Sequence, residues 1–200
     1  MTKPQRLDVM VSSTSLDLPR HREQARAGIM RAGHHPIGME TLSAANQNAV
    51  DVSLALVEEA EVYAGIFGQR YGYRPVDPRN PDDLSITEME YRHAKSLGMP
   101  ILIYWMHAEH PAPDTAGMSA AEGRAVYDNF YESDPTGRDL LDKLRNALGV
   151  EYVIGFYKSP EDLRGLISDS LREKKLIDQA YAYAEKRAAA AAAPAAAASA

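Results

Sequence analysis

The 200-residue sequence predicts an α/β fold, in which a parallel sheet is covered by helices on both faces. Short apolar runs alternate with segments of helical periodicity through the first half of the chain. The runs VYAGIF and PILIYWM are apolar almost throughout, which is typical of strands buried on both faces. Alternation of this kind indicates βαβ units, whose strands run parallel.

The expected strands are short apolar runs that end at polar or turn residues. LDVMV leads into the polar loop SSTS, and VYAGIF, the clearest central strand, leads into the glycine-containing loop GQRYGYRP. HHPIGME is a weaker strand because it contains Pro36 and Gly38. We therefore expect strands at residues 7–11, 34–40, 62–67, 100–106 and 151–156.

The expected helices combine apolar periodicity with recognisable ends. Pro19 suits the first turn of one helix, and Gly33 suits its C-terminal stop. Ser159 and Pro160, followed by acidic residues, form a strong start for the last helix, which we expect to continue to Lys174 and beyond. The expected helices cover residues 18–32, 48–60, 85–97, 120–130 and 138–148, and a last one that begins after Ser159.

The composition limits the class of protein. With 45% hydrophobic and 25% charged residues, the chain suits one soluble globular domain. A formal net charge of −6 argues against a nucleic-acid partner. The absence of cysteine excludes disulfides, Cys-ligated zinc and a thiol nucleophile. We see no signal peptide and no membrane span, so we expect a cytoplasmic protein.

The end of the chain differs in composition from the rest. Residues after Ala188 are almost all alanine, which indicates a frayed helix or a linker. We divide the chain into a domain at residues 1–176 and a helical extension with an Ala-rich tail or linker at residues 177–200. We expect further C-terminal domains in the natural protein.

Glu90 is the residue that the helical pattern does not explain. Ser85 and Glu88 match a capping box, in which the Glu88 carboxylate reaches back to the Ser85 backbone N–H. Glu90 instead falls on the apolar face, and Glu88 points almost the opposite way. A buried carboxylate needs a partner, or it faces a crevice at the C-terminal ends of the strands. Periodicity alone leaves both readings open. The face with Glu90 comprises Ile86, Met89, His93 and Leu97, with Ala94 at its edge.

The loop after the first strand supplies candidate binding residues. Ser12, Ser13 and Thr14 offer hydroxyl and backbone N–H groups to a phosphate or a ribose, although loop and cap chemistry explains them equally well. Asp17 is a candidate ribose contact, with a helix cap as the simpler interpretation. We expect Arg20 and Arg22 to be solvated helix residues.

The loop after the third strand supplies the second set. Gly68 lets the backbone approach a ligand, and Arg70 suits a diphosphate. Tyr71 or Tyr73 suits stacking on a base, and the alternative is a tight loop with the tyrosine rings packed on it. We expect no metal site, because prolines follow the His107–His110 pair and no helix is expected there.

Five separated segments together resemble the DUF4062 family. They cover most of residues 7–171 and stand in the expected order: VMVSSTSLDLPRHREQA, GHHPIGME, VEEAEVYAGIFGQRYGY, SITEMEYRHAKSLGMPILI and FYKSPEDLRGLI. The resemblance implies kinship with TIR domains and nucleoside 2-deoxyribosyltransferases. It also implies a flavodoxin-like, three-layer fold with a five-stranded parallel sheet of order 2-1-3-4-5. The family typically stands at the N-terminus of larger bacterial proteins, including predicted defence and signalling proteins.

The same resemblance assigns a role to Glu90. Glu90, Ala94, Gly98 and Pro100 reproduce a pattern shared by the wider group, whose glutamate attacks or stabilises a ribose. It implies a glycohydrolase of NAD(P)+ or a related nucleotide, with Glu90 catalytic and NAD+ or NADP+ as substrate, not as cofactor. The alternative is a non-catalytic, self-associating signalling module. A nucleoside deoxyribosyltransferase is disfavoured, because the usual Asp-x-Gly-Thr sequence is replaced by DLSIT at residues 83–87.

Overall fold

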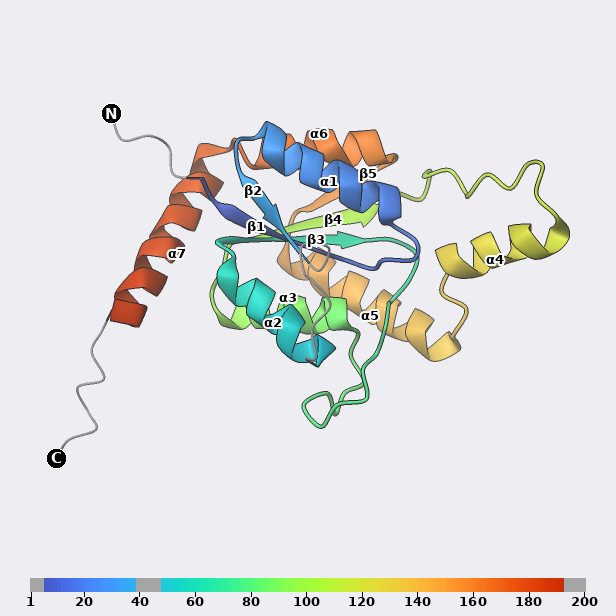
Figure 1. Ribbon diagram of the computed structural model, residues 1–200, viewed down its shortest axis with the longest axis horizontal. Coiled ribbons are helices and arrows are strands. Elements are labelled where there is room, and N and C mark those ends of the chain that lie inside the picture. Colours follow the sequence, from blue (N-terminus) through green and yellow to red (C-terminus); the bar gives the residue numbers. More distant parts are fainter. Residues whose placement is uncertain (1–5, 39–47, 193–200) are drawn as a thin grey trace.

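The computed structural model, which describes residues 6–38 and 48–192, contains a five-stranded parallel sheet. The strand order is β2-β1-β3-β4-β5, so the α/β class and the flavodoxin-like order are both confirmed (Figure 1). The strands are β1 (Asp8–Ser13), β2 (His35–Ile37), β3 (Val62–Phe67), β4 (Ile101–Met106) and β5 (Ile154–Tyr157).

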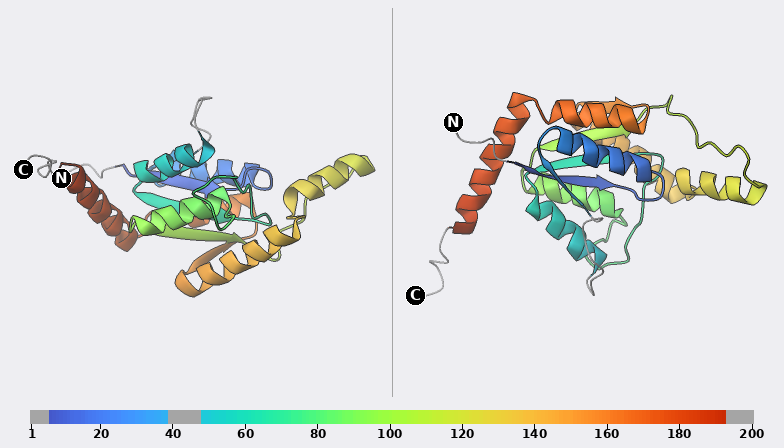
Figure 2. Two further views of the ribbon diagram at one scale, coloured as in Figure 1. Left: turned by 90° about the horizontal axis from the view of Figure 1, so that it is seen from below. Right: turned by 45° about the horizontal axis from the view of Figure 1, so that its top comes forward.

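Helices cover the sheet on both faces. Helices α1 (Pro19–Arg31) and α6 (Pro160–Ser170) lie together on one face, while α2 (Ala49–Glu59), α3 (Ile86–Ser96) and α5 (Pro135–Glu151) lie on the other (Figure 1). All six residues of β3 are buried between these layers, as its uniformly apolar sequence predicts. Two further helices, α4 (Ala120–Phe130) and α7 (Lys174–Ala192), lie at opposite ends of the molecule (Figure 2).

The helix signals at both ends of α1 are confirmed. Pro19 occupies the first turn, and Gly33 follows the helix with a φ of 91°, a left-handed conformation that glycine adopts readily. Gly28 allows α1 to approach α6 closely, since a Cβ atom built there would lie 2.7 Å from the Arg164 carbonyl oxygen. The pairing of these two helices therefore depends on a residue without a side chain.

Three expected elements have different bounds. The expected strand at 151–156 begins only at Ile154, because α5 extends through Glu151, whose carboxylate lies 2.6 Å from Lys95 Nζ and accepts from Tyr91. The last helix does not continue unbroken past Lys174, since α6 ends at Ser170 and a turn separates it from α7. The second strand is three residues long, and the end of its expected range lies outside the described residues.

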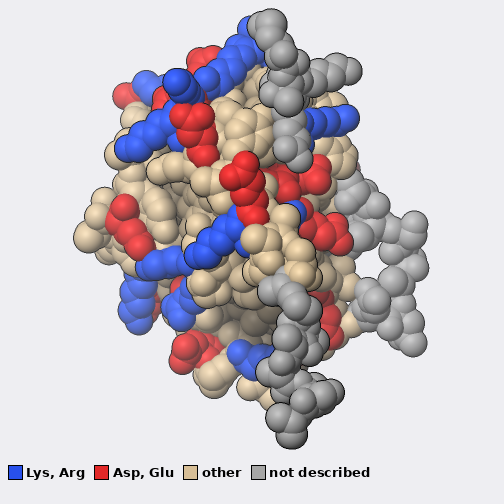
Figure 3. Space-filling model, turned by 90° about the vertical axis from the view of Figure 1, so that its left-hand side faces the viewer, with Lys and Arg blue, Asp and Glu red and all other residues tan. Residues whose placement is uncertain are grey.

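Helix α7 is attached to the domain by a few side chains. Leu176 and Ala180 belong to the hydrophobic core. The Arg187 guanidinium donates to the Glu58 and Ala60 carbonyl oxygens at the end of α2, at 2.7 and 2.8 Å. Basic and acidic side chains are interspersed over this end of the molecule (Figure 3).

The division of the chain that we expected falls within this region. The expected boundary after residue 176 lies in the first turn of α7, and the alanine-rich residues after 192 lie outside the described part. No helix among the described residues is long and apolar enough to cross a membrane.

Candidate functional site

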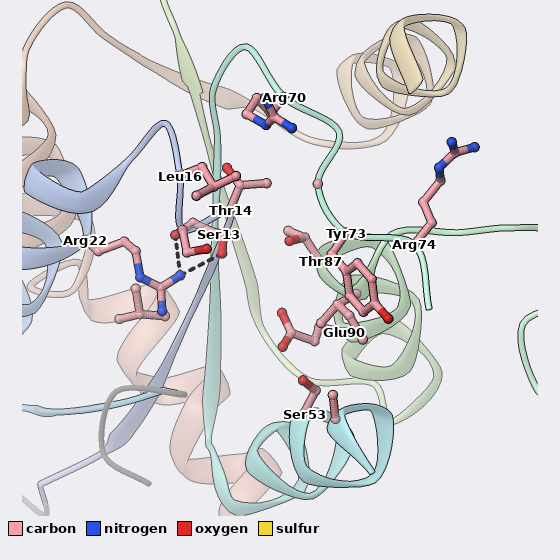
Figure 4. Close-up of a pocket in the computed structure, with 15 residues that line it drawn as sticks. Ser13, Thr14, Leu16, Arg22, Ser53, Arg70, Tyr73, Arg74, Thr87 and Glu90 are labelled. Carbon is pink, nitrogen blue, oxygen red and sulfur yellow. Dashed lines mark hydrogen bonds between the residues drawn. The ribbon is translucent and has the colours of Figure 1, made fainter. Parts of the chain in front are cut away.

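A cavity of about 630 Å³ lies at the C-terminal ends of β1 and β3. The chain leaves these neighbouring strands toward opposite edges of the sheet, and ligands of open α/β folds bind at such a switch point. Ser13 faces this space from the end of β1, and Thr87 and Glu90 face it from α3 (Figure 4). The lining residues are Val11, Ser13, Thr14, Ser15, Leu16, Arg22, Ala49, Ser53, Arg70, Gly72, Tyr73, Arg74, Ile86, Thr87 and Glu90.

Glu90 is a buried carboxylate at the wall of this cavity. Only 3% of the residue is exposed, although it lines the cavity. The Ser12 hydroxyl donates to the Glu90 carboxylate, and Tyr63 Oη donates to Ser12 Oγ at 2.8 Å. Burial, and then the charge of Glu90, raise the pKa of Tyr63 well above its ordinary value, so its hydroxyl remains a donor. This chain of donors fixes the orientation of the carboxylate.

The helical face that carries Glu90 is rotated from the one we predicted. The buried residues of α3 are Thr87, Glu88, Glu90, Tyr91 and Ala94, whereas Ile86 and Met89 are half-buried. The second half of the predicted capping box is wrong. Ser85 Oγ accepts from the Glu88 N–H as expected, but the Glu88 carboxylate binds the Tyr71 hydroxyl at 2.6 Å and Arg92.

Glu88 therefore has a structural explanation that differs from the predicted one. Its carboxylate is buried and joins α3 to the loop after β3 through Tyr71. It does not line the cavity. The two glutamates of α3 thus have different surroundings, and of the two only Glu90 faces the space where a ligand fits.

Several predicted binding residues have internal partners instead. Asp17 accepts from the Thr14 hydroxyl and from the Gln69 N–H, and neither caps α1 nor lines the cavity. Burial raises the pKa of this carboxyl above its ordinary value. Gly68 is required by the same contact, since a Cβ atom there would lie 2.5 Å from Asp17 Oδ2. Asp17 and Gly68, which we named as candidate ligand contacts, are not among the residues that line the cavity.

The two tyrosines of the loop after β3 have different environments. Tyr71 is 2% exposed with its ring in the core, so it is not placed to stack on a base. Tyr73 lines the cavity and is 70% exposed, which leaves its ring accessible to a flat ligand. Ser12, another candidate binding residue, is buried and does not line the cavity, and its hydroxyl donates to Glu90.

Three arginines line the cavity, with different neighbours. Arg74 is paired with Asp83 and Asp134, so its charge is already compensated. Arg70 Nη1 donates to the Asp128 and Tyr131 carbonyl oxygens at 2.6 and 3.2 Å. The guanidinium groups of both therefore have partners outside the cavity.

Arg22 is the arginine that the sequence-based prediction misjudged. It is half-buried, lines the cavity and donates to the Ser13 carbonyl oxygen at 2.6 Å and the Ser13 hydroxyl at 2.8 Å (Figure 4). The prediction of a solvated residue is wrong. Its bonds to Ser13 hold the guanidinium beside the C-terminal end of β1.

Ser53 and Thr87 also line the cavity and were not predicted. Ser53 lies on the buried face of α2 between Val50 and Val57, and a polar residue within an apolar stripe is the signal that singled out Glu90. Thr87 lies three residues before Glu90 on the same helix. No group of three or more His, Cys, Asp or Glu side chains suited to a metal ion occurs among the described residues.

The family model described as a domain of unknown function, DUF4062, matches residues 8–172. The chain belongs to the DUF4062 family. The match spans every strand of the sheet and all the residues that line the cavity. No curated protein matches this chain. The site of this DUF4062 domain is therefore interpreted from its own geometry.

Proposed function

We propose that this DUF4062 domain cleaves the N-glycosidic bond of NAD+, NADP+ or a related nucleotide, in the cytoplasm and in bacterial defence or signalling. The observation that carries the proposal is Glu90. It is a carboxylate fixed by a neighbouring serine and placed at the wall of a cavity large enough for a nucleotide. The other buried carboxylate of α3, Glu88, is bound by Tyr71 and Arg92 and lies outside the cavity, whereas Glu90 lines it.

The chemistry requires one well-placed negative charge. As the bond between C1′ and the nicotinamide nitrogen breaks, its electron pair leaves with the neutral nicotinamide. Positive charge then develops on the ribose, and the Glu90 carboxylate stabilises it. A water molecule adds to C1′, and its proton passes through Glu90 to solvent. Neutral nicotinamide is a good leaving group, so a second carboxylate to act as general acid is not needed.

The other lining residues suit the remaining parts of a nucleotide. Arg22 lines the cavity, is held by Ser13 beside the C-terminal end of β1, and suits a phosphate. The exposed ring of Tyr73 can stack on a base. Ser53 and Thr87 offer hydroxyl groups near Glu90 for the ribose.

A non-catalytic, self-associating signalling module is the second candidate function. The observation that favours it is the exposed helix α4, none of whose residues is buried. Self-association and catalysis are compatible, because some enzymes act only after assembly. The two candidates are separated by measuring the reaction itself.

The experiment is the release of nicotinamide from NAD+ and from NADP+, measured by chromatography. The domain is assayed alone and fused to an oligomerising partner, as the native protein, Glu90→Gln and the exposed control Glu23→Gln. We expect release by the native protein and the control and a loss of at least ~100-fold in Glu90→Gln. No release in any form would exclude the enzyme. Equal release by Glu90→Gln would exclude Glu90 as the catalytic group.

A further inference from the structure

Helix α4 stands away from the body of the domain. It projects beyond the end of the sheet in Figure 1 and in both views of Figure 2. None of its 11 residues is buried. Helices this short are marginal in water on their own, and most protein helices are stabilised by packing one face. Phe130, in its last turn, packs against the hydrophobic core, whereas the face that carries Tyr127 stays exposed.

That face is apolar and shaped by large and small residues. Tyr127 is 44% exposed and Tyr131 36%, and their rings stack with centroids 5.5 Å apart. Gly123 and Ala120 lie one and two turns before Tyr127 on the same side of the helix, and Met118, 45% exposed, precedes the helix. An open depression lies along this side of the helix and is formed entirely by this arm of the chain. Its lining residues are Thr115, Met118, Ser119, Ala120, Gly123, Arg124, Tyr127 and Asp128.

Helix α4 is nevertheless held in a defined orientation. Its first turn carries a complete capping box, in which Ser119 and Glu122 satisfy each other's backbone N–H groups. Its last turn is tied to the domain by Arg70, which donates to the Asp128 and Tyr131 carbonyl oxygens. The apolar face is thus pre-organised, which lowers the entropy cost of binding a partner.

We propose that this face pairs with α4 of a second copy of the chain, antiparallel and about a twofold axis. In such a pair, each helix turns the same flank toward the other copy. Two residues of that flank that lie equally far from the axis, one on each side of it, therefore come opposite each other in the two copies. Arg124 and Asp128 share a flank, next to the apolar face. With the axis beside Val126, Arg124 of each copy comes opposite Asp128 of the other.

The side chains between the flanks are also complementary. Antiparallel pairing brings the C-terminal tyrosines of one helix to the N-terminal half of the other, where Ala120 and Gly123 leave room for a ring. One pair of short helices buries less than the roughly 800 Å² per partner of a standard interface. We therefore expect weak self-association that becomes visible at high micromolar concentration.

The test uses charge reversal and sedimentation velocity over a concentration series. Arg124→Asp and Asp128→Arg each place like charges across the axis, so each variant alone is expected to remain monomeric. An equimolar mixture of the two is expected to associate, because each copy then supplies the charge that the other lacks. The double variant Arg124→Asp, Asp128→Arg is expected to associate like the native protein.

The mixture distinguishes the loss of this interface from damage to the helix itself. Arg124 and Asp128 are also four residues apart within one helix, with Nε and Oδ2 3.9 Å apart, and both single substitutions remove that contact. Mixing two chains does not restore a contact within either one. A native protein that stays monomeric throughout would overturn the proposal. So would single variants that associate as well as the native protein, since the contact would then lie elsewhere.

Discussion

Acid should destabilise this domain through His21. This side chain is 5% exposed, and its Nε2 lies 3.0 Å from the Nε2 of His110. The His110 Nδ1 faces the Pro111 carbonyl oxygen at 2.8 Å, so His110 donates there and its Nε2 accepts from His21. Burial, and then His110 and Arg20, lower the pKa of His21 from 6.5 to about 4.

The size of the effect follows from proton linkage. Below pH 6.5 the unfolded chain binds a proton at His21 that the folded chain does not accept until about pH 4. The free energy of unfolding therefore falls as the pH falls through this window, and His21 alone removes about 2 kcal/mol between pH 7 and pH 5. The stability contributed by neutral His21 is fully present above its unfolded pKa.

Urea unfolding at pH 7 and pH 5 measures this loss, with the fluorescence of the single, buried Trp105 as the probe. His21→Asn removes the titrating group. Between pH 7 and pH 5 the free energy of unfolding of this variant should therefore fall by about 2 kcal/mol less than that of the native protein. Equal losses in the native protein and His21→Asn would mean that His21 is not the source of the acid sensitivity.

Three further substitutions test other contacts. Ser12→Ala removes the donor that orients Glu90, so steady-state nicotinamide release should show kcat lowered on the order of 10- to 100-fold with KM little changed; a change in KM alone would contradict this role. Gly28→Ala places a Cβ atom against the Arg164 carbonyl and should lower the free energy of unfolding in urea by about 1–3 kcal/mol. An unchanged urea midpoint would argue against the close approach of α1 to α6. Arg187→Ala leaves two carbonyl groups at the end of α2 without their donor. It should cost about 1–2 kcal/mol in thermal unfolding, whereas an unchanged midpoint would mean that α7 does not support α2.

The elements of the sheet could be predicted because their signals are local. The uniformly apolar run of β3 and the capped helix that carries Glu90 appear in the structure close to their expected bounds. The strand order came from the resemblance, not from any local pattern. The end of α5 was misplaced because EYVIGF is apolar enough for a strand, yet its first residue, Glu151, continues the helix and contacts Lys95.

The site was only partly predictable, because its contacts join distant parts of the chain. The position of Glu90 followed from helical periodicity, whereas the burial of Glu88 depends on Tyr71, 17 residues earlier. Arg22 looked like a solvated helix residue because its partner, Ser13, lies before the turn into α1. Ser53 carried a usable signal, as a polar residue within the buried stripe of α2.

The central claim is that Glu90 is the catalytic carboxylate of a nucleotide N-glycosidase. Its most direct test is nicotinamide release from NAD+ by the native domain and by Glu90→Gln, with both variants first matched for thermal stability. We expect release by the native domain, alone or in oligomerised form, and almost none by Glu90→Gln. Equal release by the two variants, or none by the native domain in either form, would contradict it.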